Sequence, residues 1–138
     1  MKKVLYLCLS INLLLQAKLV EETGTIKDNA THLQWQDSEI AQPSTWRDSI
    51  KKCQELNLAG YIDWRMPNIN EFKSIRDLKE SEPAMDEKFI SKSSEVYWSS
   101  TSDAFDKTEA WSINFKYGEI EPKLKSEKAF VRCVRDYY

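Results

Sequence analysis

The sequence predicts an α+β fold, in which two short helices precede a set of mainly antiparallel strands. Between residues 43 and 78, apolar side chains recur every three or four positions, which is typical of helices with one buried face. Between residues 95 and 136, apolar and polar side chains alternate, which is typical of strands. Because the helices come early and the strands late, the order favours α+β over a doubly wound parallel sheet.

An early hairpin is predicted over residues 25–28 and 33–36. These two stretches flank Asn29-Ala30-Thr31, and asparagine tolerates the unusual φ angles that tight turns require. The same three residues match the acceptor pattern for N-linked glycosylation. We favour the turn, because a three-residue pattern carries little information.

Both predicted helices have start signals. The first begins after Pro43, with Ser44 or Thr45 as its hydroxyl cap. The second begins after Asn68, and Glu71 completes a pattern that resembles a capping box. The side chains expected on the buried faces are Trp46, Ile50, Cys53 and Leu56 for the first helix, and Ile69, Phe72, Ile75 and Leu78 for the second.

A long polar connection over residues 81–94 separates the helices from the later strands. The strands are expected over residues 95–100, 110–117, 119–124 and 128–136. In the second of them, alternation places Trp111, Ile113, Phe115 and Tyr117 on one face.

Residues 1–17 have the features of a secretory signal peptide. Two lysines follow Met1, about a dozen mostly apolar residues come next, and the small Ala17 precedes a polar stretch. The apolar run is shorter than the roughly 20 residues that span a bilayer. We expect cleavage after Ala17, a periplasmic or secreted product, and a single domain over residues 18–138 without a membrane span.

This segment has two other interpretations. One is a short helix of a cytosolic protein, although no polar face interrupts the run at helical spacing. The other is a lipoprotein signal at Cys8, which is rejected because too few apolar residues separate Cys8 from Lys3.

The charge of the chain disfavours nucleic acid as a partner. The full sequence has a net charge of −2, and the predicted cleavage removes two lysines and no acidic residue. A mildly acidic chain without a basic block lacks the electrostatic footprint of a nucleic-acid-binding protein.

Cys53 and Cys133 are expected to form a disulfide after export. Cys53 lies on the buried face of the first predicted helix, and alternation groups Cys133 with Val131 on one side of the last strand. A bridge between them closes a long loop, which corresponds to roughly 4–5 kcal/mol in the chain-entropy argument. The alternative is two separate buried thiols. A zinc site is not expected, because these cysteines and one histidine do not make a ligand set.

Several sequence blocks, in order, resemble one protein family. They are Gly60-Tyr61-Ile62-Asp63-Trp64-Arg65-Met66-Pro67-Asn68, Tyr97-Trp98-Ser99-Ser100-Thr101 and Val131-Arg132-Cys133-Val134-Arg135. The family is DUF1566, also called the Lcl C-terminal domain after a collagen-like adhesin, and the match runs from about Gly24 to Arg135. The resemblance implies a C-type-lectin-like fold, with two helices packed on a small, mainly antiparallel sheet with a long loop region. It also implies a disulfide from the first helix to the last strand, and the adhesin suggests recognition of surface glycans.

Some of these residues admit a structural or a functional role. Trp64 could stack on a sugar, with Asp63 and Arg65 binding hydroxyl groups. We favour a core position for Trp64, with Asp63 and Arg65 paired to backbone or to each other. Pro67 ends this extended segment and Asn68 caps the following helix, while Trp98 and Trp111 are expected on strands that face the core.

The candidate ligand-binding residues lie between two of the late strands. They are Thr101, Ser102, Asp103, Asp106 and Lys107, which combine hydroxyl groups with both signs of charge in a predicted loop. The triplets with which lectins of this fold bind sugar through calcium do not occur, since Glu121-Pro122-Lys123 lacks an amide or carboxylate at its third position. No metal or cofactor is therefore expected.

No residue is singled out for catalysis. The single histidine, His32, has no serine or cysteine nucleophile motif nearby, and the three glycines are too scattered for a phosphate-binding loop. We therefore expect an exported binding module that recognises a glycan or a protein partner at the cell envelope. The alternatives are a small cell-wall hydrolase that uses paired carboxylates and a structural subunit of a surface assembly.

Overall fold

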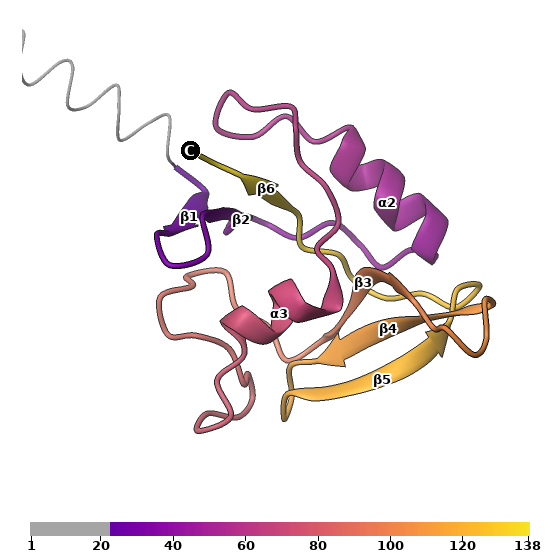
Figure 1. The fold of residues 1–138 in the computed structure, drawn as a ribbon. Coiled ribbons are helices and arrows are strands. Elements are labelled where there is room, and N and C mark those ends of the chain that lie inside the picture. The colour runs from indigo at the N-terminus through magenta and orange to yellow at the C-terminus, as the bar shows by residue number, and fades with distance from the viewer. Residues whose placement is uncertain (1–22) are drawn as a thin grey trace, which may run out of the picture.

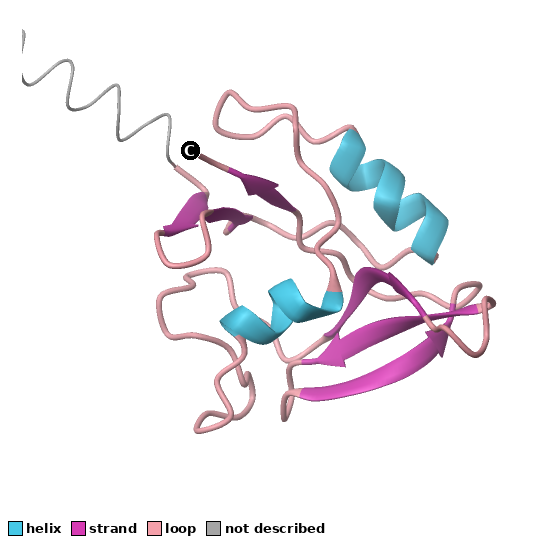
Figure 2. Cartoon of the chain, in the orientation of Figure 1, coloured by secondary structure: helices cyan, strands magenta, loops and turns pink. Residues whose placement is uncertain are grey.

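The computed structural model describes residues 23–138, so the predicted signal peptide lies outside the described residues. Within them, two helices and six strands are present (Figures 1 and 2). The elements are β1 (Thr25–Asp28), β2 (Leu33–Gln36), α2 (Trp46–Gln54), α3 (Ile69–Ile75), β3 (Val96–Ser102), β4 (Glu109–Asn114), β5 (Glu119–Leu124) and β6 (Val134–Asp136). This content confirms the α+β class.

The strands form two small antiparallel sheets, whereas the resemblance implied one. The first sheet has the order β1-β2-β6 and the second has the order β3-β4-β5. Because β6 pairs with β2, the last strand of the chain returns to the first hairpin. Figure 1 shows α3 between the two sheets and α2 along the outer side, near β3.

Two apolar clusters hold these elements together. One lies around α3 and both sheets and contains Trp35, Phe72 and Tyr97, all fully buried. The other lies under α2 and contains Cys53 and Trp98. Burial of each large apolar side chain contributes about 1.5–3 kcal/mol, so the two clusters fix α2 and α3 on the sheets.

The local signals at the helix starts are confirmed. Thr45 caps α2, since its hydroxyl accepts a hydrogen bond from the Asp48 N–H. Asn68 and Glu71 form a complete capping box at the start of α3, because each side chain accepts from the other residue's backbone N–H. The predicted hairpin is also present, with Asp28 opposite Leu33.

The hairpin turn differs from the prediction in one respect. The residue with positive φ is His32, at 55°, and not Asn29. Four residues connect the strands, and His32 reverses the chain just before β2 begins. Asn29 instead accepts a hydrogen bond from the Tyr137 hydroxyl, which ties the turn to the segment after β6.

Two side chains at the ends of predicted apolar faces are exposed. Leu78 is 67% exposed, because α3 ends at Ile75 and Arg76 turns extended to pair with Met85. Tyr117 is 53% exposed, because β4 ends at Asn114 and the next four residues form a turn. The apolar repeat therefore extends beyond the element in both cases.

The predicted last strand is interrupted. Ala129 and Phe130 form isolated bridges to Ser44 and Tyr97, and regular pairing with β2 begins only at Val134. The segment between them passes from the second sheet to the first. Both of its sides are consequently buried, including the side that carries Arg132.

Candidate functional site

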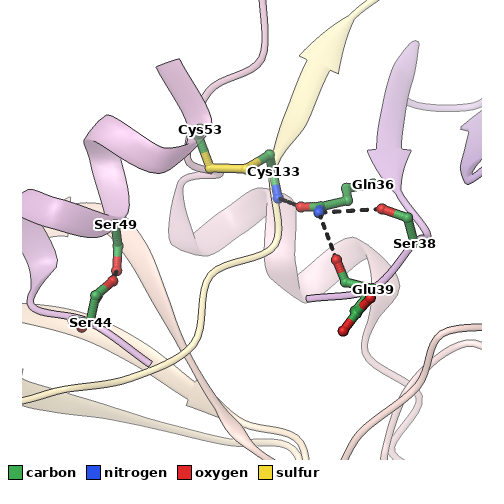
Figure 3. The surroundings of a disulfide bond; sticks show 7 residues. All are labelled: Gln36, Ser38, Glu39, Ser44, Ser49, Cys53 and Cys133. Atoms are coloured by element: carbon green, nitrogen blue, oxygen red, sulfur yellow. Dashed lines mark hydrogen bonds between the residues drawn. A yellow bond between two sulfur atoms is a disulfide. The ribbon is translucent and has the colours of Figure 1, made fainter. Parts of the chain in front are cut away.

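A disulfide joins Cys53 in α2 to Cys133 just before β6, as predicted (Figure 3). The two Cα atoms lie 5.5 Å apart, and both residues are buried. Gln36 of β2 fixes the second cysteine, since its backbone N–H donates to the Cys133 carbonyl at 2.9 Å and its side-chain oxygen accepts from the Cys133 N–H at 3.0 Å. The bridge therefore connects α2 to the first sheet across the interior.

Next to the disulfide lies a fully buried arginine, Arg132. Its guanidinium donates to the backbone carbonyls of Gln36 and Ser91, and it lies 3.8 Å from a carboxylate oxygen of Asp37. Burial lowers the pKa of the Arg132 guanidinium from its usual value, while Tyr97 and the Asp37 charge oppose that shift. The rings of Phe89 and Tyr97 lie 5.1 and 5.7 Å from its central carbon.

Asp37 and Arg132 together hold the long connection over residues 81–94 against β2. The Asp37 carboxylate accepts from the backbone N–H groups of Ile90 and Ser91, at 3.0 and 2.8 Å. Arg132 binds the carbonyl of the same Ser91. Sequence reasoning missed this role, because alternation within an assumed strand placed Arg132 opposite the buried face.

The Asp63-Trp64-Arg65 segment is integrated into the scaffold. Trp64 is buried, and its indole N–H donates to the Tyr61 carbonyl at 3.1 Å. The favoured interpretation paired Asp63 and Arg65 with backbone or with each other, but these two side chains do not pair with each other. Asp63 instead binds Arg135 at 2.6 Å, and Arg65 binds Glu71 and Asp136.

The pKa of the Asp63 carboxyl is expected to lie below the usual aspartate value of about 3.9. The hydrogen bond from Arg135 lowers the pKa of the Asp63 carboxyl. The stabilisation from this pair is therefore present above the unfolded-state pKa and is lost as the pH falls through the lower folded-state pKa. We predict that NMR titration of the Asp63 carboxyl carbon shows the lowered pKa, and that Arg135→Gln raises it.

A control variant and one contradicting outcome test whether Arg135 causes the lowered Asp63 pKa. In the control variant Arg65→Gln, the Asp63 titration should be unchanged, because Arg65 binds other carboxylates. An Asp63 pKa that stays low after Arg135→Gln would contradict the assigned cause.

The candidate ligand-binding residues divide between a strand and a loop. Thr101 and Ser102 belong to β3, where the Thr101 hydroxyl accepts from the Ile69 N–H at 3.1 Å and so supports the start of α3. In the loop, the buried Asp103 accepts from the Phe105 N–H, and Asp106 accepts from Thr108. The Asp103 and Asp106 carboxylates therefore stabilise the backbone of their own loop.

Phe105 and Lys107 are among the exposed residues of the loop after β3. Phe105 is fully exposed, at 100%. Lys107 is also exposed, and its side chain has no ion-pair partner among residues 23–138. Of the five predicted ligand-binding residues, only Lys107 lines the surface depression described next.

Three segments meet at one end of the molecule and enclose an open depression of about 460 Å³. They are the start of α2, the loop between β3 and β4, and the stretch after β5, which lie together at the right of Figure 1. We call this surface the Trp46 face. It comprises Thr45, Trp46, Arg47, Asp48, Lys107, Lys125 and Ser126.

Trp46 and Lys125 form the fixed part of the Trp46 face. The Trp46 indole N–H donates to the Ser99 carbonyl at 2.8 Å, which anchors the half-buried ring to β3. The Lys125 ammonium lies 4.2 Å from the centre of that ring and donates to the Ser102 hydroxyl and the Lys107 carbonyl. An aromatic surface and a cation are thereby held in place without a ligand.

A second, adjoining depression of about 670 Å³ shares Trp46, Arg47 and Asp48. It continues along the exposed side of α2 past Lys51 to Glu55. An aromatic ring with hydrogen-bonding side chains on both sides can bind a ligand that has both apolar and polar surface. Helical periodicity assigned Trp46 to the core and gave no sign of this exposure.

No metal-binding or membrane-spanning feature is found in the part of the chain that the structure describes. Residues 23–138 contain no group of three or more histidine, cysteine, aspartate or glutamate side chains arranged to hold a metal ion. None of the helices described has the length and apolar character needed to cross a bilayer. His32 lies in the hairpin turn beside the Tyr137 ring.

The fold and the Trp46 face define a small α+β domain, closed by a long-range disulfide, with an open and partly aromatic surface depression. Comparison with protein families matches residues 24–135 to the Lcl C-terminal domain. The chain therefore belongs to the Lcl C-terminal domain family, as the resemblance indicated. No curated protein matches the chain.

Proposed function

We propose that this protein is an exported binding module of C-type-lectin-like architecture that recognises a glycan at the cell envelope through the Trp46 face. The observation that carries the proposal is the Trp46 ring, held half-exposed in an open depression by Ser99 and Lys125. A sugar ring has an apolar face and a polar rim, so it matches an aromatic surface surrounded by hydrogen-bonding groups.

The shape of the site supports an extended ligand. Two depressions of about 460 and 670 Å³ meet at Trp46. Both are open, as suits a polymer that enters and leaves along the surface. The disulfide and the Trp46–Ser99 hydrogen bond fix the underlying α2, which limits the ordering cost on binding.

Export is supported by two observations. A buried disulfide is typical of proteins that fold in an oxidising compartment. Residues 1–17 have the composition of a signal peptide.

The hydrolase alternative receives less support. The depression richest in carboxylates, of about 380 Å³, lies over β5 and includes Glu109, Glu119, Glu121 and Glu127. All four residues are exposed or only half-buried. A carboxylic acid that protonates a leaving group needs an apolar enclosure to raise its pKa, and this open groove does not provide one.

One observation favours a protein partner as a second candidate. Phe105 is fully exposed on a loop that Asp103 and Asp106 stiffen, and an exposed aromatic side chain is typical of protein interfaces. Under this candidate, sedimentation equilibrium of the purified domain shows self-association that Phe105→Ser abolishes. Under the glycan proposal, Phe105→Ser leaves a monomer unchanged.

The glycan proposal is tested by binding of the purified domain to a panel of envelope polysaccharides. We predict that Trp46→Ala lowers the affinity for the most tightly bound polysaccharide by at least about tenfold, as expected for a central aromatic contact. The matched control is Tyr117→Ala, which removes a half-exposed aromatic ring from the turn between β4 and β5, at the other end of the sheet. Trp46→Phe keeps an aromatic ring but loses the indole N–H that binds Ser99, so it should lower the affinity less than Trp46→Ala does.

Three results would refute the proposal. The first is an equal loss of affinity in Trp46→Ala and Tyr117→Ala. The second is unchanged affinity in Trp46→Ala. The third is a complete absence of binding across the panel, with thermal unfolding confirming that the wild-type protein is folded.

A further inference from the structure

The indole N–H of Trp35 is a buried donor that the protein itself does not pair. Trp35 of β2 is fully buried, and its Nε1 has no hydrogen-bond acceptor within residues 23–138. The buried Trp64 differs, since its N–H donates to the Tyr61 carbonyl. A buried N–H that loses its hydration without a replacement is destabilising, so an acceptor beside Trp35 is expected.

A small cavity of about 20 Å³ lies against Trp35. It is found where β1 meets the connection over residues 81–94, which passes below β1 in Figure 1. Its apolar walls are formed by Ile26, Ile75 and Phe89. Because a cavity needs roughly 10–15 Å³ to hold one water molecule, this one has room for a water and not for a larger ligand.

Asp28 provides an acceptor on the same face of the first sheet as Trp35. Ile26 lies directly opposite Trp35 in the pairing of β1 with β2, and alternation places the Asp28 side chain on the same side as Ile26. The Asp28 Oδ1 accepts from the Ala30 N–H at 2.9 Å. Its Oδ2 has no donor within residues 23–138 and can accept from a bound molecule.

Asp86 provides a second acceptor from the connection that faces β1. Its Oδ1 accepts from the Lys88 N–H at 2.9 Å, and its Oδ2 has no donor in the described part of the chain. The Asp86 N–H donates to the Ile75 carbonyl at 2.9 Å, which holds this residue beside α3. One donor and two carboxylates therefore line the same cavity, together with the exposed Lys27 and Lys88.

We infer that this cavity binds one long-lived water molecule, which accepts a hydrogen bond from the Trp35 indole N–H and donates to the Asp28 and Asp86 carboxylates. The groups around the cavity determine the chemical class of the ligand. A cation cannot accept from the indole N–H, and two carboxylates repel an anion, whereas water both accepts and donates. The water joins the first sheet to the connection over residues 81–94, and this role is independent of any ligand of the Trp46 face.

NOESY and ROESY spectra of the purified domain, recorded with selective excitation of water, test the inference. We predict a cross-peak between water and the Trp35 indole proton with opposite signs in the two spectra, which a bound water produces and chemical exchange does not. Trp35→Phe removes the indole N–H and thereby assigns its resonance. The Trp64 indole proton, which is buried but donates to a carbonyl, is the internal control and should show no such cross-peak.

Substitutions identify the acceptors. In the double variant Asp28→Asn/Asp86→Asn, each amide oxygen can still accept from the turn N–H, but an NH₂ group replaces the second carboxylate oxygen. The water cross-peak of Trp35 should disappear in this variant. Asp106→Asn changes a similar turn between β3 and β4, away from the cavity, and should leave the cross-peak unchanged. Far-ultraviolet circular dichroism verifies that each variant is folded.

A crystal structure of the wild-type protein provides a second measurement that does not depend on the variants. Electron density for a water within about 2.7–3.2 Å of Trp35 Nε1 and of a carboxylate oxygen is the expected result. A dry cavity, or a protein atom that accepts from Trp35 Nε1, overturns the inference. The absence of the wild-type cross-peak, or its persistence in a folded Asp28→Asn/Asp86→Asn variant, also overturns it.

Discussion

Loss of the disulfide should lower the free energy of unfolding by roughly 4–5 kcal/mol. The bridge joins residues 80 positions apart, so it restricts a large part of the unfolded chain. It is also the covalent connection between α2 and the segment that enters the first sheet. For a domain of this size, a loss of that magnitude is a large share of the total stability.

The double variant Cys53→Ala/Cys133→Ala, compared with the oxidised wild type by urea denaturation, provides the measurement. The matched control is Ser49→Ala, a buried change in the same helix that removes the hydrogen bond to Ser44 (Figure 3). The control should cost only about 0.5–1.5 kcal/mol. A loss below about 1 kcal/mol in the double cysteine variant would contradict the structural role of the bridge.

The substitution Arg132→Met should destabilise the protein by about 3–5 kcal/mol. It removes a buried cation and leaves the Asp37 carboxylate without its charge partner. The carbonyls of Gln36 and Ser91 also lose their donor. Methionine replaces only the aliphatic part of the arginine side chain, so the loss combines the polar contacts of the guanidinium with the space that it leaves.

Urea denaturation of Arg132→Met, Asp37→Asn and the double variant forms a thermodynamic cycle. The coupling between the two positions should be favourable, because the remaining charge is uncompensated in either single variant. In Asp37→Asn, hydrogen exchange should accelerate at the Ile90 and Ser91 amides, because these N–H groups donate to the Asp37 carboxylate. Arg47→Met, on the surface, should stay within about 0.5 kcal/mol of the wild type. Additive effects and unchanged exchange would contradict a linked pair.

Sequence reasoning succeeded where short-range chemistry determines the structure. Thr45 and Asn68 act at helix starts, where the capping side chain and its backbone partner are close in sequence. The hairpin and β5 follow from alternation and turn residues. The disulfide was predictable because Cys53 and Cys133 each have neighbours whose periodicity indicates burial.

The errors arise where tertiary contacts override a repeat. Leu78 continues the apolar spacing of α3, but pairing of Arg76 with Met85 ends the helix first. Arg132 lies in a segment that resembles an ordinary strand. Its burial depends on Asp37 and Ser91, which are distant in sequence and whose proximity no local pattern reveals.

The candidate site was predicted only in part. Composition selected the loop after β3 correctly as an exposed segment, yet Asp103 and Asp106 mainly stabilise that loop. Lys107 is the one predicted residue that lines the Trp46 face. Trp46 was assigned to the core, because its spacing to Cys53 is helical. The depression itself depends on three segments that meet only in the folded chain.

Backbone chemical-shift mapping by NMR, with the best-binding polysaccharide fragment added to the mature domain, tests the central claim most directly. We expect the shift changes to concentrate at residues 45–48, 107 and 125–126. Changes that cluster in the groove over β5 or around Tyr117 instead would show that the Trp46 face is not the binding site.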